Sequence, residues 1–187
     1  MSTPLTLLRS LHRVALLALL FVVVVMPEPA SAQAPRREVV EELLGGIESS
    51  ATEAEWRAMG EGTVPVLVSI FDDASEPQPV RLRAVWAARF FATEVSRRFL
   101  TRVASDPSQP GMVVRSAAQS LAAAFDRSAV ATLGPLLTHA DPAVREATIA
   151  ALARVGGPEA RAALVARRGR ETELAAALER ALSAIRD

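Results

Sequence analysis

Hydrophobic residues recur along the chain with the spacing of amphipathic helices, and this spacing itself repeats. Starting at Val144, the positions three, four, seven, eight and eleven residues further on hold Ala147, Thr148, Ala151, Leu152 and Val155. Thr148 is the one polar member of this set. These offsets trace a single stripe along a helix with about 3.6 residues per turn. The stripe therefore predicts a helix that buries one face.

The same stripe occurs three more times in the sequence. Val80, Val114 and Leu174 each begin a segment with these offsets, and the one misfit is Arg83 in the first copy. The four starting residues lie 34, 30 and 30 positions apart. A period of roughly 20 to 50 residues is the signature of a repeat architecture. The pattern thus predicts a stack of similar units.

A shorter apolar segment precedes each stripe, so each repeat is predicted to be a pair of helices. These segments are 64–71, 95–104, 129–137 and 158–167. Turn residues separate the helices: Asp141 before Pro142 is typical of a helix start, and Gly156-Gly157 before Pro158 is typical of an end and a new start. We call the two members of each pair the A helix and the B helix. Residues 62–187 are predicted to form about four such hairpins.

Two acidic helices are predicted ahead of the repeats. The segment REVVEELL (37–44) is amphipathic and ends at two glycines. A second helix is predicted over 52–59, where Thr52 and Glu55 have the spacing of a capping box. Neither segment has the stripe of the repeats. We interpret residues 33–61 as acidic N-terminal capping helices.

The first 32 residues have the three parts of a secretory signal peptide. A basic segment (9–13) precedes an apolar run (14–26), and Ala30-Ser31-Ala32 supplies the small residues that a signal peptidase accepts. The thirteen apolar residues fall short of the roughly 20 that cross a bilayer as a helix. We expect cleavage after Ala32, with Ala34 as the alternative. The mature protein is then periplasmic or secreted and has no membrane span.

Composition limits the ways in which the chain can be stabilised and the partners it attracts. It contains no cysteine, so an exported form relies on burial and not on disulfides. Residues 33–76 hold three arginines and ten acids, a net charge of −7, whereas residues 77–187 hold sixteen arginines and ten acids, a net charge of +6. The resulting charge of −1 provides no net field for nucleic acid. We expect no nucleic-acid partner.

The segment DPAVREATIAALARVG (141–156) resembles the HEAT-like repeat of the type first described in phycobilisome lyases. The resemblance extends from about residue 63 to the C-terminus. It implies an all-α fold, a short right-handed α-solenoid of stacked helical hairpins of the HEAT or armadillo type, with the B helices on its concave side. In such repeats an aspartate and an arginine commonly form a ladder that links neighbouring units. The matching residues here are Asp141 with Arg145, Asp106 with Arg115, and Asp73 with Arg81, and the last unit lacks both.

Few residues are suited to catalysis or metal binding. After removal of the signal peptide His139 is the only histidine, and cysteine is absent, so the usual ligands of zinc and transition metals are scarce. No G-x-S-x-G motif is present. The clustered Glu38, Glu41 and Glu42 fall on the polar face of a helix, which favours a solvated surface over an acid–base pair. We expect no catalytic residue, no metal site and no cofactor.

The first B helix differs from the others outside its stripe. Leu82, Val85 and Trp86 are apolar, whereas the corresponding positions of the second copy are polar. Either the acidic N-terminal helices cover this patch, or it is exposed and contacts a partner together with Arg83 and Arg89. Tryptophan and arginine are enriched in binding hot spots. Arg83, Trp86 and Arg89 are therefore the candidate partner-binding residues.

The sequence leaves three functions open. The first is an exported, non-catalytic scaffold that binds a protein partner through its concave face. The second is an accessory or maturation factor of the lyase-like HEAT type, and the third is a purely structural component of an envelope complex. A pocket with converging polar groups favours the second, and a smooth groove favours the first. The sequence does not indicate an oligomeric state.

Overall fold

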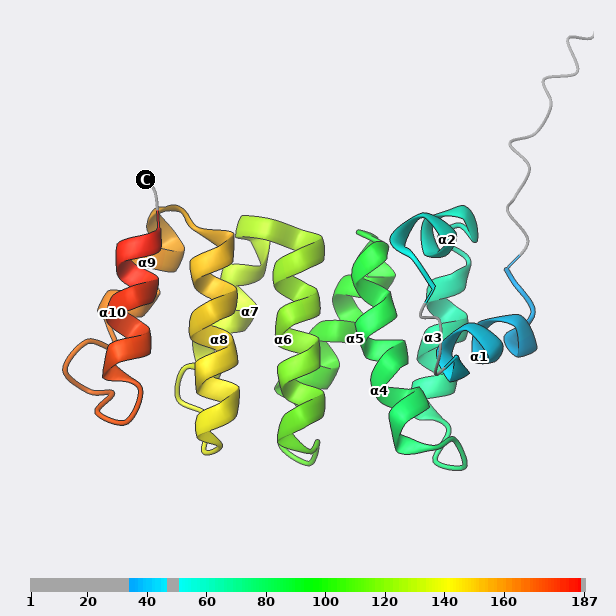
Figure 1. The fold of residues 1–187 in the computed structure, drawn as a ribbon, viewed down its shortest axis with the longest axis horizontal. Coiled ribbons are helices and arrows are strands. Elements are labelled where there is room, and N and C mark those ends of the chain that lie inside the picture. Colours follow the sequence, from blue (N-terminus) through cyan, green and yellow to red (C-terminus); the bar gives the residue numbers. More distant parts are fainter. Residues whose placement is uncertain (1–33, 47–50, 186–187) are drawn as a thin grey trace, which may run out of the picture. The chain divides into compact units, whose positions relative to one another are not determined.

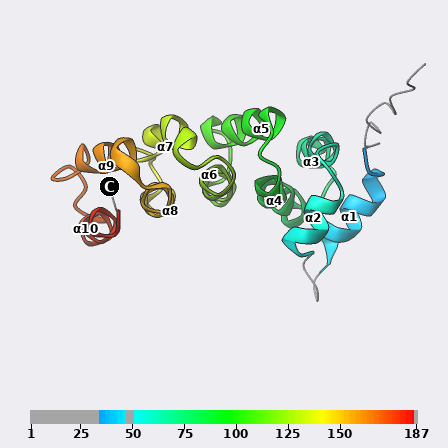
Figure 2. The ribbon, with the colours of Figure 1, turned by 90° about the horizontal axis from the view of Figure 1, so that it is seen from above.

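The helices of the chain are arranged in two layers (Figures 1 and 2). The computed structural model describes residues 34–46 and 51–185, which contain ten α-helices, two short 3-10 helices and no strand. All of these residues lie within one compact unit. The all-α prediction is confirmed for them. The predicted signal peptide, residues 1–32, and its cleavage site lie outside the described residues.

Each of the four predicted hairpins is present. The A helices are α3 (Thr63–Asp72), α5 (Glu94–Ser105), α7 (Val130–Leu136) and α9 (Gly157–Val165). The B helices are α4 (Gln78–Ala87), α6 (Gly111–Phe125), α8 (Pro142–Val155) and α10 (Ala175–Ala184), with 3-10 helices at η1 (Ala88–Phe90) and η2 (Asp126–Ala129). Each helix packs against its hairpin partner and against the same helix of the neighbouring hairpins. Figure 2 shows the A and B helices as separate rows. The fold is therefore a helical solenoid.

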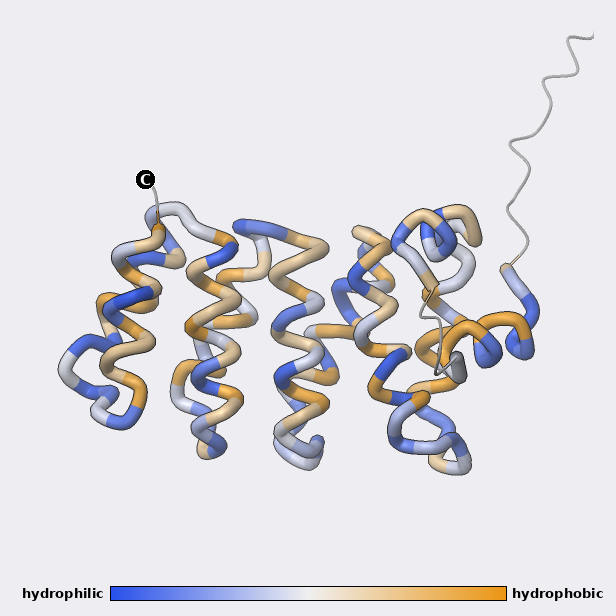
Figure 3. Tube along the Cα trace, in the orientation of Figure 1, coloured by the Kyte–Doolittle hydropathy of each residue, from blue (hydrophilic) through white to orange (hydrophobic). Residues whose placement is uncertain are grey.

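The predicted stripes form the contacts between these helices. Val114 and Val144 are buried, together with most of the stripe residues that follow them. The hydroxyl of Thr148, the polar member of its stripe, donates a hydrogen bond of 2.8 Å to the Val144 carbonyl oxygen. Hydrophobic and hydrophilic residues alternate along each helix in Figure 3, as expected when one stripe is buried. The repeated spacing in the sequence thus corresponds to the repeated packing of the helices.

The N-terminal helices α1 (Arg37–Gly45) and α2 (Glu53–Ala58) lie at the first hairpin. α1 packs against both α3 and α4, and Trp56 of α2 is fully buried in the core. The predicted capping box is present: the Thr52 amide donates to the Glu55 carboxylate at 2.7 Å, and the Glu55 amide donates to the Thr52 hydroxyl at 3.3 Å. None of the described helices combines the length and the apolar character needed to cross a membrane.

Candidate functional site

The aspartates of the expected ladder stabilise helix starts and turns. Asp141 is the N-cap of α8 and accepts a hydrogen bond of 2.8 Å from the Ala143 amide. Asp106 accepts from the hydroxyl and the amide of Ser108, and these hydrogen bonds lower the pKa of Asp106 to about 2. Asp73 binds its own turn in the same way. Among the described residues no ion pair joins any of the three to its expected arginine: turn amides and hydroxyls bind these short side chains, and Asp73 pairs with Arg37 instead.

The arginines of the expected ladder bond to other groups. The Nε of Arg81 donates to the Phe71 carbonyl oxygen at 2.7 Å, and Nη1 of Arg145 donates to the His139 carbonyl oxygen at 3.0 Å. Arg81 therefore binds the last turn of α3, and Arg145 binds the turn that precedes α8. Arg115 forms no hydrogen bond or ion pair with any residue in the described part of the chain. Its guanidinium faces a hollow on the B helices instead.

One of the three ladder arginines does link neighbouring units, through an acid that the sequence pattern did not indicate. The Nε of Arg145 donates to Glu171 at 2.9 Å, and its Nη2 donates to Glu173 at 2.8 Å. Burial tends to raise the pKa of Glu171, but its hydrogen bonds and the charge of Arg145 hold the pKa below its usual range. Glu171 stands 30 residues after Asp141 and also accepts a hydrogen bond from the Leu174 amide. The last unit therefore has an acid at the register position of Asp141, and this acid is a glutamate, which reaches further than aspartate.

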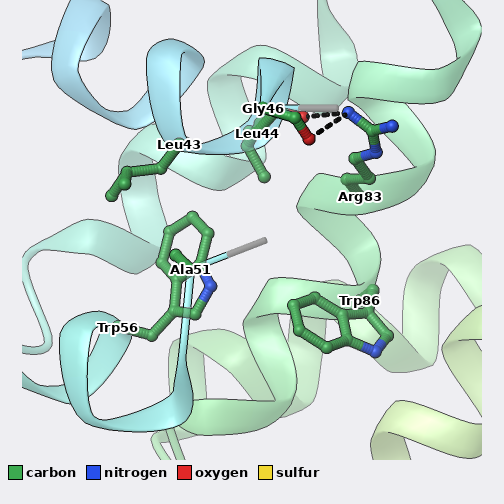
Figure 4. A pocket seen from close by; sticks show the side chains of 7 residues that line it. All are labelled: Leu43, Leu44, Gly46, Ala51, Trp56, Arg83 and Trp86. Carbon is green, nitrogen blue, oxygen red and sulfur yellow. Dashed lines mark hydrogen bonds between the residues drawn. The ribbon is translucent and has the colours of Figure 1, made fainter. Parts of the chain in front are cut away.

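Arg83, a candidate partner-binding residue, is occupied within the chain. Its Nη1 donates to the Leu44 carbonyl oxygen at 2.6 Å and lies 3.5 Å from that of Gly46 (Figure 4). Carbonyls in the last turn of a helix have no partner inside the helix. Arg83 therefore satisfies the end of α1 and ties this helix to α4.

The apolar patch of the first B helix is covered only in part. Val85 is fully buried and belongs to the core, whereas Leu82 and Trp86 are partly buried. The Trp86 ring packs edge-on against Phe90, with 4.9 Å between ring centroids. A hollow of about 320 Å³ separates Trp86 from the N-terminal helices (Figure 4); it is lined by Leu43, Leu44, Gly46, Ala51, Trp56, Arg83 and Trp86. The N-terminal helices thus cover the patch only in part, and its contact with a partner stays a prediction.

Two more hollows continue along the B helices. The one between α4 and α6 has a volume of about 420 Å³ and is lined by Leu82, Arg83, Trp86, Met112, Arg115, Ser116 and Gln119. The next, of about 260 Å³, is lined by Arg89, Gln119, Ala122, Ala147, Ala150, Ala151 and Arg154. Adjacent hollows share residues, namely Arg83 and Trp86 in the first case and Gln119 in the second. We call the surface formed by the residues of these three hollows the B face.

The B face carries positive charge. Four arginines line the three hollows, and none of the described residues in their lining has a carboxylate or an imidazole. The Arg89 guanidinium lies 5.3 Å from the centroid of the Trp86 ring, and its Nε is buried with no acceptor among the described residues. Burial and the nearby charge of Arg154 lower the pKa of Arg89. The surface is suited to binding apolar and anionic groups.

Metal-ligating residues do not gather elsewhere in the part of the chain that the structure describes. No group of three or more His, Cys, Asp or Glu side chains there has an arrangement that could hold a metal ion. His139 lies in the turn before α8, where its Nδ1 accepts a hydrogen bond of 3.1 Å from the Asp141 amide. This histidine therefore contributes to the turn.

Residues 108–183 match the family model described as HEAT repeats. This part of the chain is similar to HEAT repeats. The matched segment includes α6, α8 and α10, three of the four B helices. HEAT repeats commonly serve as scaffolds for protein interactions, and the fold is typically non-catalytic. The comparison with curated proteins found no match.

Proposed function

We propose that the chain is an exported, non-catalytic scaffold that binds a protein partner through its B face. In proteins of the HEAT type that the sequence resembles, the B helices line the concave side of the solenoid. The observation that carries the proposal is the row of three adjoining hollows across α4, α6 and α8. A row of this kind offers one continuous surface to a partner.

Trp86 is the proposed anchor of this surface. It lines two of the three hollows, so a partner on either side of α4 contacts it. Phe90 and Arg89 hold its ring from two directions. A side chain that is already fixed loses little conformational entropy on binding. Fixed aromatic residues surrounded by apolar and cationic groups are typical of hot spots.

The lining of the B face favours binding over maturation chemistry. Proton transfer requires a carboxylate, an imidazole or a similar group within hydrogen-bond reach of the substrate. The three hollows present guanidinium groups, one amide and one hydroxyl besides apolar side chains. These groups bind and orient a partner.

The signal-peptide pattern of residues 1–32 supports export. An exported chain works in the periplasm or outside the cell, and its partner is then an envelope or secreted protein. The chain isolated from the envelope fraction of its source organism should begin at Gln33, which mass spectrometry of the N-terminal peptide measures.

Affinity capture with the mature chain tests the scaffold function. Wild type and Trp86→Ala are used as bait in an envelope extract, and Val95→Ala serves as a matched control because Val95 is 42% exposed on α5, in the A layer. We expect Trp86→Ala to lower recovery of the partner about tenfold or more, as removal of a hot spot does. Val95→Ala should recover the wild-type amount. Equal recovery by all three baits would refute the role of Trp86 and of the B face.

A further inference from the structure

We infer that the partner segment bound by the B face is acidic, and that its carboxylates contact Arg89, Arg115 and Arg154. This inference rests on the proposed function and adds the chemical class of the partner. Arginine binds carboxylates through two parallel hydrogen bonds, which gives specificity as well as affinity.

The arginines that line the hollows form no ion pair with a carboxylate of the described residues. Six arginines elsewhere in the described chain share this property, whereas eight form ion pairs: Arg37, Arg57, Arg97, Arg98, Arg102, Arg145, Arg167 and Arg168. Of the four in the hollows, Arg83 binds backbone carbonyls. No described carboxylate thus neutralises Arg89, Arg115 or Arg154, and these three line adjoining hollows on one surface.

Arg89 and Arg154 form the strongest anion site of the three. They line the same hollow, and the charge of Arg154 is close enough to lower the pKa of Arg89. The buried Nε of Arg89 lacks an acceptor among the described residues. A buried donor without an acceptor is unfavourable, and so is the repulsion between like charges. A carboxylate between the two guanidinium groups relieves the repulsion.

The shape of this hollow fits an acidic side chain. It is lined by the four alanines Ala122, Ala147, Ala150 and Ala151, and Gln119 lines the same hollow and the next one. Small apolar side chains leave room for the methylene groups of a glutamate, while the arginines receive its carboxylate. The chemistry of the hollow thus matches both ends of such a side chain.

The spacing of the B helices gives the length of the bound segment. Neighbouring packed helices have axes about 8 to 10 Å apart, so the distance from α4 to α8 is roughly 20 Å. An extended peptide advances about 3.4 Å per residue. A segment of about six residues therefore reaches from α4 to α8. Glu146, exposed on α8 at the register position of Ser116, repels acidic groups and limits the segment at this edge.

A peptide titration tests the inference. The probe is an octapeptide of alternating glutamate and alanine with blocked termini, and the control peptide has glutamine in place of each glutamate. Nuclear magnetic resonance follows the Nε–H signals of the arginines in the mature chain. We expect saturable shifts at Arg89, Arg115 and Arg154 that weaken as salt is raised, because charge attraction is screened. Arg98, exposed on α5, should not shift.

Substitutions then separate the proposed contacts from general charge effects. Arg89→Gln and Arg154→Gln should each weaken binding of the acidic peptide about fivefold or more, whereas Arg98→Gln removes the same charge without effect. Because Arg89 is partly buried, Arg89→Lys is measured as well; it keeps the charge, loses the fork of donors and should bind with intermediate affinity. Unchanged binding by these variants contradicts the inference.

Each of three other results would also overturn the inference. The first is that the glutamine peptide binds as well as the acidic peptide. The second is that inorganic phosphate produces the same shifts at the same concentration, and the third is that neither peptide binds. The scaffold function is judged separately, by capture. A captured partner that depends on Trp86 but not on Arg89 or Arg154 leaves the function standing and removes the acidic segment. If the acidic peptide binds but capture of the partner does not depend on Trp86, the preference for acidic segments stands and the proposed role of Trp86 is removed.

Discussion

Arg145 shows how one side chain joins two repeats. It binds the carbonyls of the turn before α8 and the carboxylate of Glu171 before α10, and the two side chains are only 14% and 6% exposed. A charge buried with its partner becomes unfavourable when the partner is removed. The link therefore stabilises the junction of the last two hairpins more than a surface ion pair does.

We expect Arg145→Ala to lower the free energy of unfolding several times more than Arg168→Ala does. Arg168 is the matched control because its pair with Glu179 is more than half exposed and is therefore screened by solvent. Urea unfolding of both variants gives the comparison. Equal losses in the two variants would mean that the Arg145–Glu171 pair contributes no more than an ordinary surface pair.

Two helix starts meet where α6 and α8 lie side by side. A Cβ atom added to Gly111, at the start of α6, would lie 2.0 Å from Oδ2 of Asp141, the N-cap of α8. Glycine at this position therefore allows the cap of the neighbouring unit to approach. The contact depends on two elements that are 30 residues apart in the sequence.

Gly111→Ala should destabilise the protein by about 1 to 2 kcal/mol, because the added methyl group displaces the capping carboxylate. Gly134→Ala is the control: its Cβ meets nothing within 4 Å inside α7, so we expect no loss and a gain of up to about 1 kcal/mol. Thermal unfolding measures both. A stable Gly111→Ala protein would show that Asp141 moves without loss.

Alanine stripes set the distance between neighbouring B helices. Ala118 of α6 is fully buried, whereas Ala123 of the same helix is exposed. We expect Ala118→Leu to cost about 1 to 3 kcal/mol through overpacking. Ala123→Leu should change stability by less than about 0.5 kcal/mol, as surface substitutions do. Chemical denaturation followed by circular dichroism distinguishes them, and a neutral Ala118→Leu would contradict close packing at the stripe.

The sequence predicted the elements well because their signals are local. Stripe spacing, the Asp141 cap and the capping box at Thr52 depend on residues within one or two helical turns, and the structure contains each of them. The ladder was not predictable in the same way. Whether a carboxylate reaches an arginine depends on side-chain length and on the turn between helices, so Glu171 pairs with Arg145 and Asp141 does not.

The functional surface was only partly predictable for a similar reason. The departure from the stripe at Trp86 was visible in the sequence, and the structure places this residue between two hollows. Arg115 and Arg154 were not candidates for binding, because only the packing of three helices brings them to one face. Arg83 was a candidate, but its donors are directed at α1, which lies about 40 residues earlier.

At the scale of the whole molecule, the two layers of helices have different surfaces. Three arginines of α5 in the A layer pair with carboxylates, as Arg102 does with Asp72 of α3. The B layer presents hollows lined by arginines and an aromatic anchor. This asymmetry is the physical basis of the proposed scaffold function, because it gives a partner one preferred side.

Site-specific photo-crosslinking in the source organism tests this central claim most directly. The photoreactive residue is placed at Ser116, in the hollow between α4 and α6, or at Ser69, exposed on α3 in the A layer. The account predicts a crosslink to one partner protein from position 116 and none from position 69. A crosslink from position 69 with none from position 116 would contradict it.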